Sequence, residues 1–114
     1  MGTRAQVYFP ETKIYLYQHY DGYNLPNTVR DALKRGKDRW DDPEYLARIV
    51  FCEMIRDDID GTAGYGIDAV RHDDIEYLVT LDTNRQRVIV QNIYEESCLS
   101  FSFDEYINRT QTSW

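Results

Sequence analysis

One helix-forming stretch, residues 42–57, constrains the fold more than any other part of this sequence. Its apolar residues recur at helical spacing and cover most of the circumference, so the helix must be buried on most of its sides. Asp41 stands at the N-cap position, with Glu44 three residues later as a capping-box partner. We predict that this helix lies across a sheet, and that Ile49→Asp or Phe51→Asp prevents folding.

The other apolar residues alternate with polar ones, at the two-residue period of β-strands. The stretches 3–9 and 14–20 are separated by a Pro-Glu turn, and they predict an antiparallel hairpin. A third strand is expected at 66–70. A second hairpin is expected from 75–82 and 86–92.

Two short helices and a short strand complete the pattern. The first helix is expected from Pro26 to about Lys34, and a strand is expected near 99–103. Ser102 and Glu105 form a capping box that opens a short terminal helix. The order β-β-α-α-β-β-β-α predicts an α+β fold, a mainly antiparallel sheet with helices packed on one face. The length corresponds to a single domain over 1–114.

The balance of charges limits the kinds of partner. The net charge is −7, from 20 acidic and 13 basic side chains. Because affinity for nucleic acid comes from neutralising phosphates, direct binding of DNA or RNA is not expected. A protein partner with a basic surface fits this balance, and so does a purely solubilising role for the charge.

The apolar runs and the cysteines indicate where in the cell the protein is located. No run is long enough to span a bilayer and the N-terminus lacks an apolar signal core, so we expect a cytoplasmic protein without a membrane partner. Cys52 and Cys98 lie far apart in sequence and outside any C-x-x-C motif. We interpret both as reduced core residues.

A dense group of aromatic and polar residues begins within the second predicted strand and continues into the turn before the next helix. The group consists of Tyr15, Tyr17, His19, Asp21 and Tyr23. Histidine can move a proton or bind a metal near neutral pH, and helix N-termini favour anions. The group is therefore a candidate site for a small molecule, a nucleotide or a metal, while a structural role as a wet aromatic sheet face remains open.

Histidine and carboxylate neighbours occur twice, as His19 with Asp21 and as His72 with Asp73 and Asp74. An acid-base or metal site would require the two groups to converge. The acidic run before Gly61 lacks the first and last acidic ligands of a calcium loop, and the nearby glycines do not form a dinucleotide fingerprint. We assign no catalytic residue, no metal ligand and no cofactor.

The N-terminal quarter resembles a known family. Thr3-Arg4-Ala5 precedes a strand, and Tyr17-Gln18-His19-Tyr20-Asp21-Gly22-Tyr23 follows. The pattern is similar to that of small uncharacterised proteins of tailed phages and prophages, which begin with a Thr-Arg-Ala strand and continue into Tyr-x-His-Trp-Asp-Gly-Tyr-Pro. Tyr20 replaces the usual Trp, and the proline comes late, at Pro26. The resemblance implies a phage or prophage origin and carries over no catalytic residue.

These observations favour a small acidic phage accessory protein that is not an enzyme. We expect it to inhibit a host defence protein, in the manner of anti-CRISPR proteins, through acidic and aromatic surfaces. The partner would be a host protein with a basic surface, such as a nucleic-acid-handling defence complex. The expected partner-binding carboxylates are those of Asp57, Asp58, Asp60, Asp73, Asp74, Glu76, Glu95 and Glu96.

The strand at 14–20 carries large side chains on both faces. If the helices cover only the face with Ile14 and Leu16, the face with Tyr15, Tyr17 and His19 must be covered in another way or remain in water. A second copy of the chain in a symmetric dimer is one way to cover it.

Overall fold

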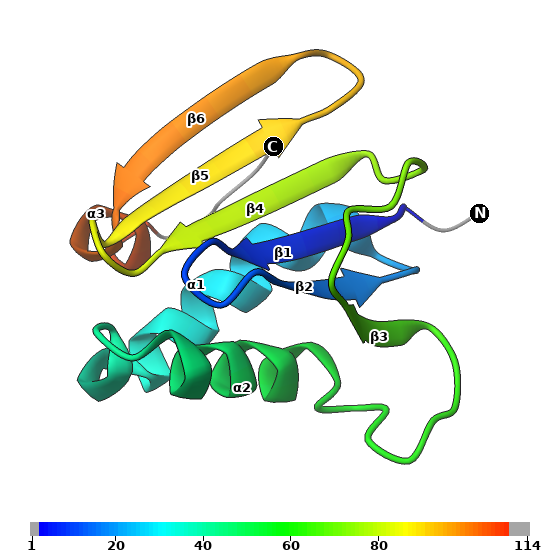
Figure 1. Ribbon diagram of the computed structural model, residues 1–114, viewed down its shortest axis with the longest axis horizontal. Coiled ribbons are helices and arrows are strands. Elements are labelled where there is room, and N and C mark those ends of the chain that lie inside the picture. The colour runs from blue at the N-terminus through cyan, green and yellow to red at the C-terminus, as the bar shows by residue number, and fades with distance from the viewer. Residues whose placement is uncertain (1–2, 110–114) are drawn as a thin grey trace.

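In a computed structural model, residues 3–109 are described, and they form one six-stranded sheet with three α-helices (Figure 1). Two short 3-10 helices, η1 and η2, flank the first α-helix. The order along the chain is β1 (Ala5–Phe9), β2 (Ile14–Gln18), η1 (Gly22–Asn24), α1 (Leu25–Arg35), η2 (Lys37–Arg39), α2 (Pro43–Met54), β3 (Tyr65–Asp68), β4 (Tyr77–Asp82), β5 (Arg87–Asn92), β6 (Ser97–Ser102) and α3 (Phe103–Ile107).

The α+β class is confirmed, and the sheet is mixed. Its strand order is β3-β2-β1-β4-β5-β6. All neighbouring strands of this sheet are antiparallel except β1 and β4, which run parallel. The chain leaves β2, passes through both long helices and β3, and returns on the other side of β1, so β4 enters the sheet in the direction of β1.

Several predicted boundaries require correction. The helix expected at 42–57 is α2, Pro43–Met54. Its N-cap is Asp42 and not Asp41, because the carboxylate of Asp42 accepts the N–H of Tyr45. The strand expected at 66–70 is β3, Tyr65–Asp68, and the carboxylate of its last residue accepts the N–H of Ala69 at 2.7 Å. The capping box of Ser102 and Glu105 is confirmed.

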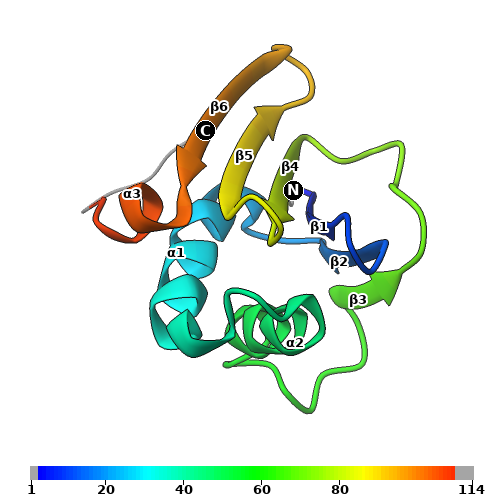
Figure 2. The same cartoon turned by 60° about the vertical axis from the view of Figure 1, so that its left-hand side comes forward.

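The core lies between the sheet and the helices α1 and α2, which the two views place on the same side of the sheet (Figures 1 and 2). Val7 and Leu16 from the first hairpin and Leu33 and Val50 from the helices are almost completely buried. Each such side chain contributes about 1.5 to 3 kcal/mol. The indole N–H of Trp40 donates to the carbonyl of Leu33 at 3.0 Å and fixes the turn between the helices.

The apolar stripe of α2 faces the core, as expected, and is not buried to the same degree along its width. Leu46, Val50 and Met54 are buried, whereas Ile49 and Phe51 are only partly covered. Both of these side chains still pack against the core. The effect of either Asp substitution on folding therefore stays a prediction.

Both cysteines are free, and both are exposed instead of lying in the core. Within residues 3–109, no helix combines the length and the apolar character that crossing a bilayer requires.

Gly22 is the glycine whose replacement should disturb the fold most directly. It is buried, its N–H donates to the carbonyl of Thr3 at 2.8 Å, and an added Cβ would collide with that carbonyl oxygen. We expect Gly22→Ala to lower the free energy of unfolding by roughly 1–3 kcal/mol in urea titrations. Gly66→Ala is the control, because its Cβ meets nothing within 4 Å and should change stability by less than about 1 kcal/mol. Equal losses in the two variants would contradict this account.

Glu53 links the ends of the two long helices. Its carboxylate accepts hydrogen bonds from Arg56 at 2.7 Å and from Arg35 at 3.2 Å. The guanidinium of Arg56, followed by that of Arg35, outweighs burial and lowers the pKa of Glu53. A lowered pKa means that the stabilisation is present above the unfolded value of about 4.3 and is lost as pH falls through the folded value.

Glu53→Gln should therefore lower the urea midpoint at pH 7, and the difference from the original protein should shrink below pH 4. Glu96→Gln, at an exposed turn, serves as the control and should change neither midpoint. A Glu53→Gln deficit that is the same at both pH values would exclude the ion pairs as its cause.

Candidate functional site

A loop covers part of the sheet face directed away from the helices, which we call the open face. Ala5 and Val7 of β1 belong to the core, so the alternating residue Gln6 lies on the open face. Gln6 is nevertheless fully buried. Its Oε1 accepts the N–H of His72 at 2.9 Å, and its Nε2 donates to the carbonyl of Val70 at 3.3 Å. This side chain fastens the loop 69–76 to the centre of the sheet.

Two histidines that are distant in sequence meet at Tyr17. The ring of His72 stacks on that of Tyr17 with centroids 4.4 Å apart. The Tyr17 hydroxyl lies 3.0 Å from Nδ1 of His19, to which Nε of Arg4 also donates at 3.2 Å. Burial, followed by the charge of Asp74, raises the pKa of Tyr17, so its hydroxyl remains protonated at neutral pH. The cluster therefore covers part of the aromatic face from within the same chain.

The carboxylate that contacts His72 is not one of the two that directly follow it in the sequence. His72 lies 3.1 Å from Asp68, not beside Asp73 or Asp74, and the backbone N–H of Ala69, followed by His72, lowers the pKa of Asp68. Asp74 pairs with Arg4 at 3.5 Å.

Only part of the predicted aromatic group converges. Tyr17 and His19 are in contact, whereas Asp21 lies near Tyr65 and adopts a left-handed backbone with φ 58°. Tyr23 is 63% exposed in η1. In the described part of the chain, no three His, Cys, Asp or Glu side chains are placed to hold a metal ion. The contacts of Tyr17 and Gln6 hold the loop 69–76 against the sheet.

The predicted acidic segments gather at one end of the sheet. The register aligns Tyr65, Gln18, Ala5, Tyr77 and Asn92 as a row of neighbours across β3, β2, β1, β4 and β5. The three connections that carry the segments all adjoin this row (Figure 1). We call this surface the acidic end, and it comprises Asp57, Asp58, Asp60, Asp73, Asp74, Glu76, Glu95 and Glu96.

Carboxylates of the acidic end raise the pKa of two tyrosines in this row. Burial raises the pKa of Tyr65, and Asp58, Asp21 and Asp57 raise it further. Burial and then Glu76 and Glu95 raise the pKa of Tyr77 in the same way. Glu76 and Glu95, which come from separate connections, therefore act on one shared group, whereas the 57–60 segment acts on Tyr65.

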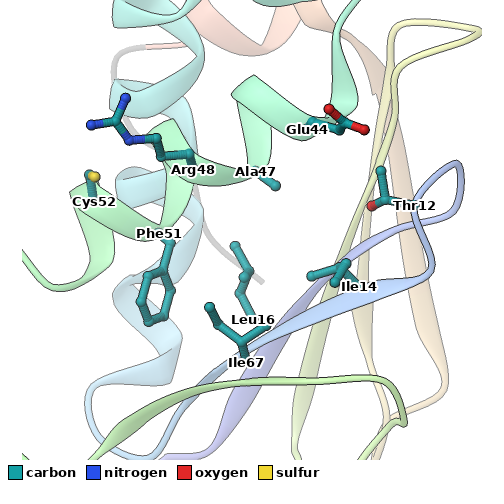
Figure 3. A pocket seen from close by; sticks show the side chains of 9 residues that line it. All are labelled: Thr12, Ile14, Leu16, Glu44, Ala47, Arg48, Phe51, Cys52 and Ile67. Atoms are coloured by element: carbon teal, nitrogen blue, oxygen red, sulfur yellow. The ribbon is translucent and has the colours of Figure 1, made fainter.

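Sequence reasoning missed an apolar groove between α2 and the strands β2 and β3. Its volume is about 490 Å³. Figure 3 shows Phe51 and Ala47 directed from α2 toward Leu16 and Ile67. Ile67 is 61% exposed although it is paired with the buried Leu16. The broad apolar stripe of residues 42–57 was the available signal, because a stripe wider than the contact surface leaves apolar side chains uncovered.

Comparison of the chain with protein-family models, with curated proteins and with solved structures found no match. The functional argument therefore depends on the geometry of these surfaces.

The role of Gln6 can be tested directly. Gln6→Leu leaves the N–H of His72 and the carbonyl of Val70 without their side-chain partner, and we expect a loss of roughly 1–3 kcal/mol in the free energy of unfolding. Hydrogen exchange at His72 should accelerate. Gln91→Leu is the control, because residue 91 shares the open face through its pairing with Leu78. Unchanged exchange at His72 in Gln6→Leu would show that other contacts hold the loop.

Proposed function

We propose that this protein binds another protein through its acidic end and inhibits it without catalysis. The partner is a nucleic-acid-handling defence complex of a bacterial host, and the mode of action is that of an anti-CRISPR protein. The observation that carries the proposal is that three acidic connections lie along the same end of the sheet.

The chemistry of such a partner suits this surface. Enzymes that hold nucleic acid present basic grooves, since they neutralise phosphates. A row of carboxylates on a rigid sheet end can occupy a groove of this kind. Tyr65 and Tyr77 lie partly covered among the carboxylates and add aromatic contact area.

Arg4 pairs with Asp74 of this surface at 3.5 Å. The Asp74 side chain is nevertheless 57% exposed, so it can also contact a partner. The resemblance of the N-terminal residues to phage and prophage proteins supports a bacterial host as the setting.

Charge reversal tests the proposal. The variant Asp57→Lys with Asp58→Lys and Asp60→Lys should lose at least about tenfold in affinity for a captured defence complex, mainly through slower association. It should also lose the ability to relieve that defence in a phage-plating assay. Binding by the original protein should weaken as salt rises, because the screening length is only about 10 Å at 0.1 M.

The matched control changes the same number of carboxylates elsewhere. Asp31→Lys with Asp38→Lys and Asp104→Lys alters exposed residues on α1, η2 and α3, outside the acidic end. It should retain affinity and activity. If the original protein relieves no defence system, or if both triple variants behave alike, the proposal is wrong.

A further inference from the structure

The outer edge of β3 has no neighbouring strand among residues 3–109. The N–H of His19 donates to the carbonyl of Gly64 at 2.8 Å, which makes these residues a hydrogen-bonded antiparallel pair. Hydrogen-bonded pairs alternate along a ladder, so Tyr65 and Ile67 direct their N–H and C=O groups away from β2. Each of the two residues therefore offers a donor and an acceptor to an incoming strand.

The groove lies directly beside this edge. Ile67 lines the groove with its side chain, so one residue contributes both a free backbone edge and an apolar wall (Figure 3). A strand added next to β3 would lie about 4.8 Å away and direct every second side chain to the groove side of the sheet. Phe51 and Ala47 of α2 form the opposite wall.

The apolar surface continues to the acidic end. A second hollow shares Phe51 with the groove and is lined further along by Tyr65, Ile59 and Asp58. Ile59 is 73% exposed. An extended ligand along β3 would therefore contact apolar side chains first and the carboxylates of the 57–60 segment next.

We propose that β3 is a docking edge for an extended segment of the partner protein. The segment adds an antiparallel strand to β3, inserts alternate apolar side chains into the groove, and places basic residues that follow them against Asp57, Asp58 and Asp60. Main-chain hydrogen bonds supply affinity, and the groove and the carboxylates supply specificity. The inference depends on the proposed function for the identity of the partner, and it adds the site and the form of the ligand.

The probe is a fluorescein-labelled synthetic peptide in which Val and Leu alternate with Thr and two Lys residues follow. Fluorescence anisotropy should show saturable binding to the full chain. Ile67→Pro removes the outward N–H and leaves the hydrogen bonds between β2 and β3 intact, so affinity should fall by roughly tenfold or more. Ile67→Val keeps the N–H and the shape of the side chain and should bind almost as the original protein does.

Two further variants separate the contributions of the groove and the charges. Ala47→Phe fills the groove and should weaken the peptide without lowering the thermal midpoint. The triple Lys variant of residues 57, 58 and 60 should weaken this peptide but leave a version with Gln in place of both Lys unaffected.

Three results would overturn the inference. They are the absence of saturable binding at millimolar peptide, equal affinities of Ile67→Pro and Ile67→Val, and a dimer in light scattering that Ile67→Pro dissociates, since a second copy would then occupy the edge. None of these results alters the phage-plating outcome, which tests the proposed function separately.

Discussion

The structure depends on β1 being hydrogen-bonded along both of its edges. Val7 is paired with Leu16 on one side and with Val79 on the other, and all three side chains are buried. The first hairpin lies inside the sheet, and the chain runs through α1, α2 and β3 between this hairpin and β4. This route leaves β3 at one edge of the sheet and β6 at the other, and it brings the three acidic connections to the same end.

Covering the sheet from one side creates the second constraint. The residues of β1 and β2 on the open face are large, and Tyr8 stacks on Tyr15 with centroids 4.3 Å apart. The chain covers part of this face itself, with the loop that Gln6 and Tyr17 hold. Burying a polar side chain is costly unless its hydrogen bonds are made, and Gln6 meets that condition with the loop backbone. The aromatic face therefore does not need a second copy to shield Tyr17.

Local patterns were sufficient for most of the elements. The alternation along 75–82 and 86–92 predicted a hairpin, and Val79 does lie opposite Val90. Ser102 and Glu105 specified a helix start through two reciprocal hydrogen bonds between near neighbours. The parallel pairing of β1 and β4 could not be predicted in the same way, because residues 72 positions apart carry no local code for their contact.

The candidate functional surfaces also combine features that the sequence predicts with features that only the fold creates. The carboxylates were recognisable in the sequence, but their assembly at one end depends on the strand order. The partner of His72 was hidden because Asp73 and Asp74 are nearer in sequence than Asp68, which the turn after β3 brings within 3.1 Å. The groove was hidden because periodicity predicts which face of a helix is apolar and does not predict how closely that face packs.

The two edges of the sheet are protected to different degrees. β6 is joined directly to α3, and the charged side chains of Arg87 and Arg109 lie against Ser100 and Phe101 of that strand. Charges near an edge discourage an incoming strand. β3 carries one charge, and the Asp68 carboxylate is already engaged by the N–H of Ala69 and by His72. The remaining protection of β3 is that the strand is short, which limits self-association along its edge. A partner segment can still bind there, because it gains further affinity from the groove and the acidic end.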